Sequence, residues 1–304
     1  MTDSAPLEAI AESAPSLRPV LQTAARAAAM DVPVLILGEA GTGRSTVARA
    51  LHAASSRAGG PLVEVDVEVI PSALFESEMF GYLPGAFTGA QAATAGRVAR
   101  AEGGTLLLDH LEGIPFAAQP KLLRLLAEKQ FSPLGGEDVK ADVRFVGIGS
   151  EDLPERVRRG AFRQDLFYRL EVVTLRLEPL RHRKEDLDPL FDFFLADLKE
   201  RFGHDRVELS AKARAWMADY SWPGNLREIR NTLERSLILE PSGHLDPPPP
   251  AVDPGGRPAS LAEMEENQIL RVLAYSRGHQ GRAAEILGIS RKTLWEKRRR
   301  YGIP

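Results

Sequence analysis

The chain has 304 residues, of which 43% are hydrophobic and 27% charged, and its formal net charge is -3. This composition is typical of a globular protein with two or three domains, and the lack of cysteine excludes a disulfide framework and a thiolate metal site. No apolar run is long enough for a membrane span and no secretion signal is present, so we expect a cytoplasmic protein without a membrane partner.

The first predicted elements are a helix at 16–30 and a short, apolar, β-branched strand at 32–37. The strand leads into a glycine-rich turn, after which a helical stretch continues through His52. This turn consists of Gly38, Glu39, Ala40, Gly41, Thr42, Gly43, Arg44 and Ser45. Strand, glycine-rich turn and helix predict a phosphate-binding loop, in which backbone N–H groups and the helix N-terminus meet an anion.

One position of this loop departs from the usual pattern GxxxxGK[ST]. Arg44 stands where that pattern has lysine, and its planar, forked head keeps the positive charge but not the geometry. Ser45 occupies the position whose hydroxyl binds magnesium. We expect nucleotide binding; the alternative is a vestigial loop whose glycines serve packing alone.

Two further predicted strands end in acidic residues. Residues 61–69 alternate between apolar and polar positions and carry Asp66, and residues 103–110 form an apolar strand that ends in Asp109 and His110. An aspartate at the carboxyl end of a buried strand suits a magnesium ligand beside a phosphate loop. We therefore assign Ser45 and Asp109 to a magnesium site.

Residues 76–90 follow neither a helix nor a strand period. The core of this stretch is Gly85, Ala86, Phe87, Thr88, Gly89 and Ala90. Only Phe87 has bulk to bury, so the pattern predicts a loop tip, flanked by helices, that holds Phe87 out as a contact. The alternative is a buried phenylalanine in a glycine-rich turn.

The middle of the chain continues the alternation of helices and strands. We expect a helix at 121–129, a buried strand at 141–150 that ends in Gly149 and Ser150, an arginine-containing aromatic block at 162–170, and helices from about 176 to 240.

The C-terminal part begins with a proline- and glycine-rich linker at 241–260. A helix at 261–275 follows, and residues 282–290 predict a helix, a glycine turn and a helix N-cap at Ser290. The next helix is strongly basic, which predicts a DNA-binding helix-turn-helix. The expected DNA-binding residues are Ser290, Arg291, Lys292, Thr293, Trp295, Lys297 and Arg298.

These motifs, above all GAFTGA at 85–90, resemble the sigma-54-dependent transcription activators, which are AAA+ ATPases. In that family this loop touches the sigma factor, and a Fis-like domain binds DNA. The resemblance spans nearly the whole chain. It implies ATP and Mg²⁺ as cofactors, with enhancer DNA, sigma-54 RNA polymerase and the other subunits of a homo-oligomeric or mixed ring as partners.

The resemblance implies an α/β fold: an AAA+ P-loop parallel sheet flanked by helices at 1–175, a helical lid at 176–240, the linker at 241–260, and a small all-α helix-turn-helix domain at 261–304. No N-terminal receiver or ligand-sensing domain is expected. Arg163 and Arg169 match arginine fingers that act on the neighbouring subunit, and Arg227 matches a lid residue that contacts phosphate; the alternatives are surface charges and a helix salt bridge.

Several positions depart from the family's hydrolytic site. Besides Arg44, His110 replaces the glutamate that polarises the attacking water. Gly149 and Ser150 replace a Thr-Asn sensor, and Asp66 replaces an asparagine that bonds that glutamate.

Three interpretations remain open. The protein is an ATP-driven remodeller whose catalytic group is the pair Asp66 and His110, or it binds DNA and sigma-54 without turning over ATP, lending Arg163 and Arg169 to a competent neighbour. In the third, the AAA+ part is only a scaffold, which the intact loop at 85–90 argues against. We expect a DNA-binding regulator of the sigma-54 type, whether or not it is an ATPase.

Overall fold

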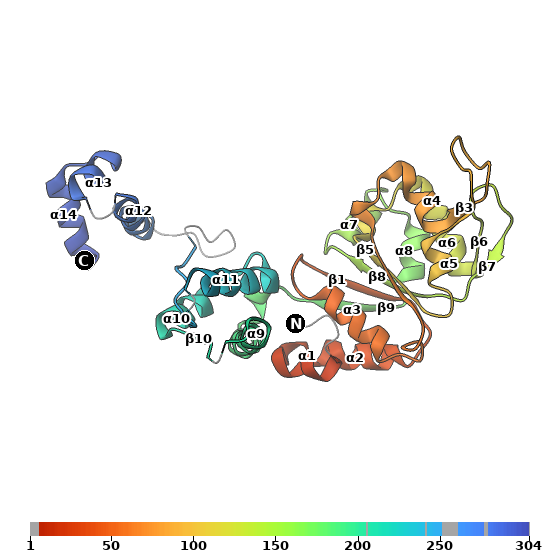
Figure 1. Ribbon diagram of the computed structural model, residues 1–304, viewed down its shortest axis with the longest axis horizontal. Helices are drawn as coiled ribbons and strands as arrows, with labels where there is room; N and C mark the ends of the chain where they lie inside the picture. The colour runs from red at the N-terminus through yellow and green to blue at the C-terminus, as the bar shows by residue number, and fades with distance from the viewer. Residues whose placement is uncertain (1–5, 205, 241, 251–260, 277–278, 304) are drawn as a thin grey trace. The chain divides into compact units, whose positions relative to one another are not determined.

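The computed structural model describes residues 6–204, 206–240, 242–250, 261–276 and 279–303. The chain divides into two compact units, Met1–Pro247 and Pro248–Pro304 (Figure 1). Residues 241 and 251–260 of the predicted linker lie outside the described residues.

The first unit is built around a parallel sheet with the strand order β2-β5-β8-β1-β9. Its strands are β1 (Val34–Gly38), β2 (Leu62–Asp66), β5 (Thr105–Asp109), β8 (Arg144–Gly149) and β9 (Val173–Leu177). All four pairings are parallel, so the carboxyl ends of the strands meet at one edge. Asp66 lies opposite Asp109 in the register, which brings two predicted site residues together.

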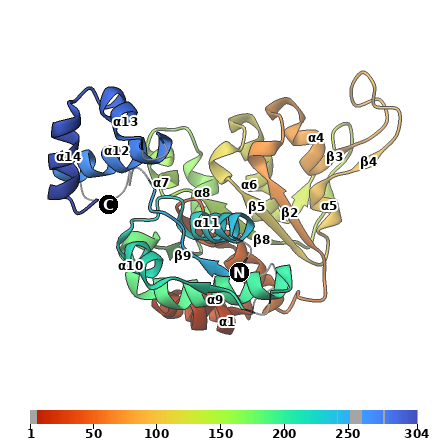
Figure 2. The ribbon, with the colours of Figure 1, turned by 60° about the vertical axis from the view of Figure 1, so that its left-hand side comes forward.

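Helices cover both faces of this sheet because successive strand residues point to opposite sides (Figure 2). Val34 and Ile36 join the cluster that packs α1 (Leu7–Ser13), α2 (Arg18–Ala28) and α3 (Arg44–Ala53). Leu35 and Leu37 join the opposite cluster. That side carries α4 (Phe75–Phe80), α5 (Arg97–Arg100), α6 (Gln119–Glu128), α7 (Leu153–Arg158) and α8 (Gln164–Leu170). The predicted α/β fold is confirmed.

Two short hairpin pairs extend this part of the unit. The strands β3 (Gly81–Tyr82) and β4 (Thr94–Ala95) are antiparallel, and so are β6 (Gln130–Phe131) and β7 (Val139–Lys140). The segment between β3 and β4 carries residues 85–90 and extends away from the sheet (Figures 1 and 2). It is flanked directly by strands, whereas helices were expected there.

The lid has its own hydrophobic core, which includes Phe191, Met217, Trp222 and Leu233. It is formed by α9 (Leu187–Phe202), α10 (Ala211–Asp219) and α11 (Asn225–Leu239), with the short parallel pair β10 (Glu208–Leu209) and β11 (His244–Leu245).

The lid boundaries differ from the predicted ones at both ends. β9 continues to Leu177, so the sheet extends past residue 175, because Val173, Leu175 and Leu177 alternate with polar residues in a strand pattern. At the other end, Leu245 is buried in the lid core and the indole of Trp216 donates to the carbonyl of Pro247. These residues were assigned to the linker, and a buried leucine explains why they pack instead.

The second strand, β2, is also shorter than predicted. So is the helix predicted at 16–30, which corresponds to α2. β2 ends at Asp66, because the carboxylate of Asp66 accepts a hydrogen bond from the backbone of Glu68 and begins a 3₁₀ turn at Val67–Val69. The sequence pattern also missed α1, which precedes the first predicted helix.

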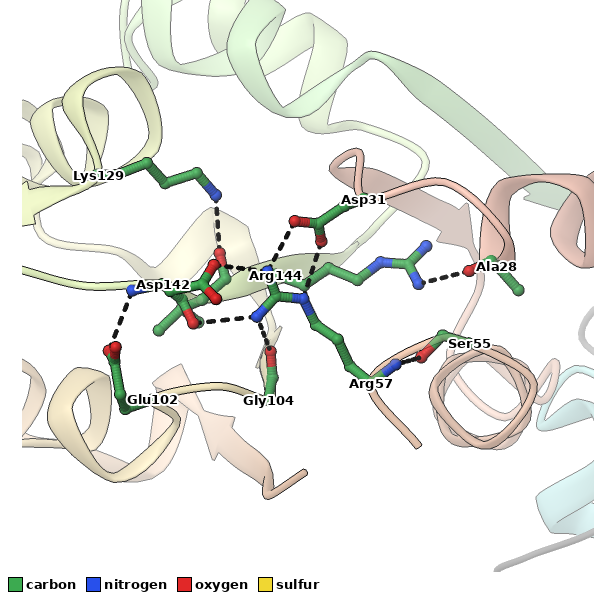
Figure 3. Close-up of polar contacts among 10 residues, drawn as sticks. Ala28, Asp31, Ser55, Arg57, Glu102, Gly104, Lys129, Asp142 and Arg144 are labelled. Atoms are coloured by element: carbon green, nitrogen blue, oxygen red, sulfur yellow. Dashed lines mark hydrogen bonds and ion pairs between the residues drawn. The ribbon is translucent and has the colours of Figure 1, made fainter. Parts of the chain in front are cut away.

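A network of charged side chains joins the amino ends of the strands (Figure 3). Arg57 forms ion pairs with Asp31, at 2.7 Å, and with Asp142, at 2.6 Å. Arg144 is only 2% exposed and donates to the carbonyls of Ala27 and Ala28, the last residues of α2. A buried cation thus caps a helix C-terminus from inside the sheet.

The second unit contains α12 (Leu261–Tyr275), α13 (Gln280–Ile286) and α14 (Arg291–Arg300). Its small core includes Ile269, Val272, Ala283 and Leu294. Gly288 adopts φ +65 in the turn between α13 and α14, a conformation that favours glycine. The Ser290 hydroxyl then accepts from the backbone of Thr293 and caps α14. The predicted helix-turn-helix is confirmed.

Candidate nucleotide cleft and recognition surfaces

A cleft of about 500 Å³ lies at the carboxyl edge of the sheet. Its floor is the glycine-rich loop after β1, and its far wall is the lid helix α11. The lining residues are Ala40, Gly41, Gly43, Arg44, Ser45, Thr46, Asp66, Glu68, Asp109, His110, Phe194, Leu226, Arg227 and Arg230. The sequence pattern missed Thr46, Glu68, Phe194, Leu226 and Arg230.

Some residues of the predicted phosphate loop line the cleft, and the others do not. Gly41 and Gly43 have positive φ angles, +79 and +102, and both line the cleft. A Cβ on Gly41 would lie 2.4 Å from the carbonyl oxygen of Gly224 in the lid, so only glycine fits there. Gly38, Glu39 and Thr42 do not line the cleft. The Thr42 hydroxyl donates to the carbonyl of Glu39 and stabilises the turn itself.

Glu39 contacts the lid. Arg181 donates both of its terminal nitrogens to the Glu39 carboxylate, at 2.6 and 2.8 Å, and these hydrogen bonds lower the pKa of Glu39. Asn225 donates to the carbonyl of Ala40, and the backbone of Leu226 donates to the carbonyl of Gly41. The loop and the lid are therefore joined by several hydrogen bonds.

Arg44 is buried at the floor of the cleft. One terminal nitrogen donates to the carbonyl of Gly38, at 2.8 Å, and to the carbonyl of Gly149, at 2.6 Å. These carbonyls end β1 and β8, so the guanidinium joins two neighbouring strands. Arg44 thus has backbone partners where a phosphate ligand was expected.

Ser45 and Asp109 meet as expected for a magnesium site. The Ser45 hydroxyl donates to the Asp109 carboxylate at 3.1 Å, across the end of β8. Both groups offer the hard oxygen ligands that Mg²⁺ prefers when phosphates complete its shell. In the part of the chain that the structure describes, no group of three or more acidic, histidine or cysteine side chains forms a metal site. The donor set therefore fits magnesium held jointly with a nucleotide.

Asp66 and His110 lie in direct contact beside Asp109. The His110 Nδ1 is 2.9 Å from the Asp66 Oδ1, and its Nε2 is 4.0 Å from a Glu68 carboxylate oxygen. His110 is held in the left-handed region, with φ 58. Burial acts to lower the pKa of His110, but the carboxylates of Asp109, Asp66 and Glu68 outweigh it and raise the pKa.

At the end of β8 stand Gly149 and the following Ser150, where the resemblance implies a Thr-Asn sensor in the family. Gly149 contributes only its carbonyl, to Arg44. The Ser150 backbone donates to Glu112, and its hydroxyl bonds to Asp152. Neither residue lines the cleft.

The two expected finger arginines lie outside this cleft. Arg163 is partly buried and pairs with Asp165 at 2.7 Å, while Arg169 is exposed and donates weakly to the carbonyl of Ala127. Arg227, by contrast, is on α11 and lines the cleft.

The loop at 85–90 is closed by its own backbone and presents an aromatic ring. The Gly85 backbone donates to the carbonyl of Ala90 at 2.8 Å, and Gly85 and Gly89 have φ angles of +83 and +103. Phe87 is 45% exposed, and its ring lies edge-on to Tyr82 with centroids 4.9 Å apart. Thr88 is exposed as well, whereas Ala90 is buried.

The expected DNA-binding residues divide into exposed and internally bonded ones. Arg291, Lys292 and Trp295 are exposed on α14, and the Arg299 guanidinium lies 5.7 Å from the centre of the Trp295 ring. Lys297 instead forms an ion pair with Glu265 of α12, which also accepts from Tyr301. Arg298 is partly buried. The expected DNA-binding residues that α14 exposes therefore lie in its first half.

Three family models match the chain in succession. Residues 10–176 match the Sigma-54 interaction domain, residues 181–248 the AAA+ ATPase lid domain, and residues 260–301 the Bacterial regulatory protein, Fis family. Among the helices that the structure describes, none combines the length and apolar character of a membrane span.

The chain is also similar to known regulators over almost its full length. It is 40% identical to the alginate biosynthesis transcriptional regulatory protein AlgB of Pseudomonas syringae pv. tomato, over 98% of this chain and 68% of that protein. It is 38% identical to the regulatory protein AtoC of Escherichia coli, over 97% and 68%. The crystal structure of NtrX from Brucella abortus in complex with ATP has a TM-score of 0.72 and 32% identity, covering 94% of this chain and 68% of that one. The chain therefore belongs to the sigma-54-dependent transcriptional regulators, with an AAA+ domain, a lid and a Fis-type helix-turn-helix.

Proposed function

We propose that this regulator binds enhancer DNA through α14, contacts sigma-54 RNA polymerase through the loop at 85–90, and binds ATP with Mg²⁺ in the cleft. The observation that carries the proposal is the exposed Phe87 ring on a loop that extends from the sheet. A loop that served only packing would bury its one large apolar side chain. Its DNA and polymerase partners place the protein in the cytoplasm.

The geometry of the loop supports a contact role. Glycines with positive φ angles flank Phe87, and the Tyr82 ring supports it from one side. The ring is therefore oriented before a partner arrives, which reduces the entropy lost on binding. Residues 85–90 form the proposed sigma-54 contact.

The helix-turn-helix supports DNA binding by its charge and shape. The N-cap of α14 and the exposed Arg291 and Lys292 offer backbone N–H groups and cations to phosphate, while Trp295 is placed to reach base edges. In a homo-oligomer, paired domains favour a site of two-fold symmetry with half-sites about 34 Å apart.

The cleft supports nucleotide binding through residues from both walls. Backbone N–H groups of the loop 40–46 and Arg227 would bind phosphate, and Ser45 and Asp109 would hold Mg²⁺, which supplies charge neutralisation when bound. The ATP complex of NtrX, a protein of the same fold, supports ATP as the nucleotide.

The proposal is tested by replacing Phe87 with alanine and measuring sigma-54 binding and transcription from a sigma-54 promoter. We expect Phe87→Ala to abolish both while DNA binding and the unfolding midpoint stay near those of the wild type, since Phe87 is only half-buried. Phe116→Ala is the matched control, because Phe116 is 54% exposed elsewhere on the same unit. Equal losses in both variants, or none in Phe87→Ala, would contradict the proposed contact.

A second candidate function, ATP hydrolysis with a rebuilt catalytic group, is favoured by the contact between Asp66 and His110. With Nδ1 oriented by Asp66, the imidazole Nε2 of His110 would take a proton from the attacking water. Arg163 and Arg169 would then act on the nucleotide of a neighbouring subunit, as in a homo-oligomeric or mixed ring.

Turnover by the full chain should fall strongly in Asp66→Asn and vanish in Asp109→Ala. If ATP binds but no turnover is measurable at any protein concentration, the protein is a regulator or ring partner without its own hydrolysis. Turnover that is unchanged in Asp66→Asn would remove the pair from the mechanism.

A further inference from the structure

The charges that line the cleft come from opposite walls. Asp66, Glu68 and Asp109 bring three carboxylates to the sheet side. A nucleotide polyphosphate adds more negative charge, so its binding depends on cations that face the cleft. The lining contains three arginines: Arg44 from the loop, and Arg227 and Arg230 from α11.

Arg44 is held at the floor of the cleft through one terminal nitrogen. Its guanidinium bonds to two backbone carbonyls that end β1 and β8, and only 8% of the residue is exposed. Turning it toward a ligand would leave both carbonyls without this donor, and an unpaired buried carbonyl costs about 1–3 kcal/mol. Arg44 therefore holds the strand ends together.

Arg230 is placed differently. It follows Arg227 by three residues on α11, so the two side chains project from one face of the helix toward the cleft. The Arg230 guanidinium lies 5.6 Å from the centre of the Phe194 ring. Phe194 is 2% exposed in the lid core and also lines the cleft, so a fixed aromatic face orients the arginine.

We propose that Arg230 is a nucleotide-phosphate ligand that takes the role left by Arg44. The inference rests on the proposed nucleotide binding and adds to it: the cation that binds phosphate comes from the lid and not from the loop. Because α11 belongs to the lid, phosphate binding would then stabilise the closed arrangement of loop and lid directly. A forked guanidinium suits bidentate phosphate contacts.

The experiment is calorimetric titration of the full chain with ATP, ADP and AMP in the presence of Mg²⁺. We expect Arg230→Ala to weaken ATP binding about tenfold or more, as a charged hydrogen bond allows, and to leave AMP binding nearly unchanged. Arg230→Lys should recover part of the ATP affinity. Arg44→Ala should keep most of the ATP preference over AMP while lowering the unfolding midpoint.

The matched control is Arg235→Ala, which removes an exposed arginine from the same helix away from the cleft. Equal ATP affinities of Arg230→Ala and Arg235→Ala, with wild-type binding intact, would overturn the inference alone. The inference would also be overturned if Arg44→Ala lost the preference for ATP over AMP and Arg230→Ala kept it. A wild-type chain that binds no nucleotide would instead refute the proposed nucleotide binding, and the inference with it.

Discussion

The two edges of the parallel sheet use charged residues in opposite ways. At the amino edge, Arg57 is paired with two aspartates and Arg144 donates to two carbonyls, so both cations have partners within the protein. At the carboxyl edge, Arg227, Glu68 and Asp109 line an open cleft. Charges matched internally stabilise a fold, whereas charges that face a cleft are available to a ligand.

The histidines at the two edges illustrate this difference. His52 is buried at the end of α3, where its Nδ1 lies 2.9 Å from the Thr105 hydroxyl. Burial, helped by the charge of Arg144, lowers the pKa of His52. His110 lies among carboxylates, which raise its pKa. The amino edge thus makes the imidazole of His52 a weaker base, and the carboxyl edge makes that of His110 a stronger one.

The largest expected effect is on stability at the amino edge. Arg144→Ala removes the donor to the carbonyls of Ala27 and Ala28 and leaves a cavity, so we expect a loss of about 3 kcal/mol in the free energy of unfolding, measured in urea. Arg100→Ala, at an exposed position on the same unit, should change it by less than about 0.5 kcal/mol. If both variants lose the same amount, the amino-edge network is not a stabilising element.

A smaller effect concerns pH. Because the folded pKa of His52 is lowered, the unfolded chain binds a proton that the folded chain does not, and stability is lost as pH falls from the unfolded pKa, about 6.5, toward the folded pKa. In that window His52 contributes at most about 1.4 kcal/mol per pH unit. His52→Gln should therefore lose less stability than the wild type between pH 7.5 and 5.5. If the free energy of unfolding changes equally with pH in both proteins, His52 does not bind a proton on unfolding.

The smallest effect extends the comparison to α14. Lys292 is exposed, so Lys292→Ala should weaken DNA binding a few-fold and reduce the salt dependence by about one counterion, without changing stability. Lys297 pairs with Glu265, so Lys297→Ala should instead lower the unfolding midpoint of the helix-turn-helix slightly. Fluorescence anisotropy at several salt concentrations and thermal unfolding separate the two. A reversed pattern would show that the Lys297 pair opens for DNA.

Much of the fold was predictable because its signals are local. The apolar strands at β1, β5 and β8 and the glycine turn of the helix-turn-helix each depend on a few neighbouring residues. The positions of Asp66 and Asp109 near strand ends were also predictable, whereas the register that sets them opposite each other is a finding of the structure. β9 was missed because its alternation covers only five residues and comes directly before a long helical region.

The sequence by itself determined the motifs: the phosphate loop, the exposed Phe87 in its glycine-rich loop, and the capped basic helix. Only the tertiary structure decided which partner each charge received. Arg44 bonds to Gly149, 105 residues away, and Glu39 to Arg181, 142 residues away. Spacing along the chain does not encode such contacts, because a hydrogen bond depends on where folding brings a carbonyl or carboxylate. The same holds for Arg230, which becomes a cleft residue only once α11 lies against the loop.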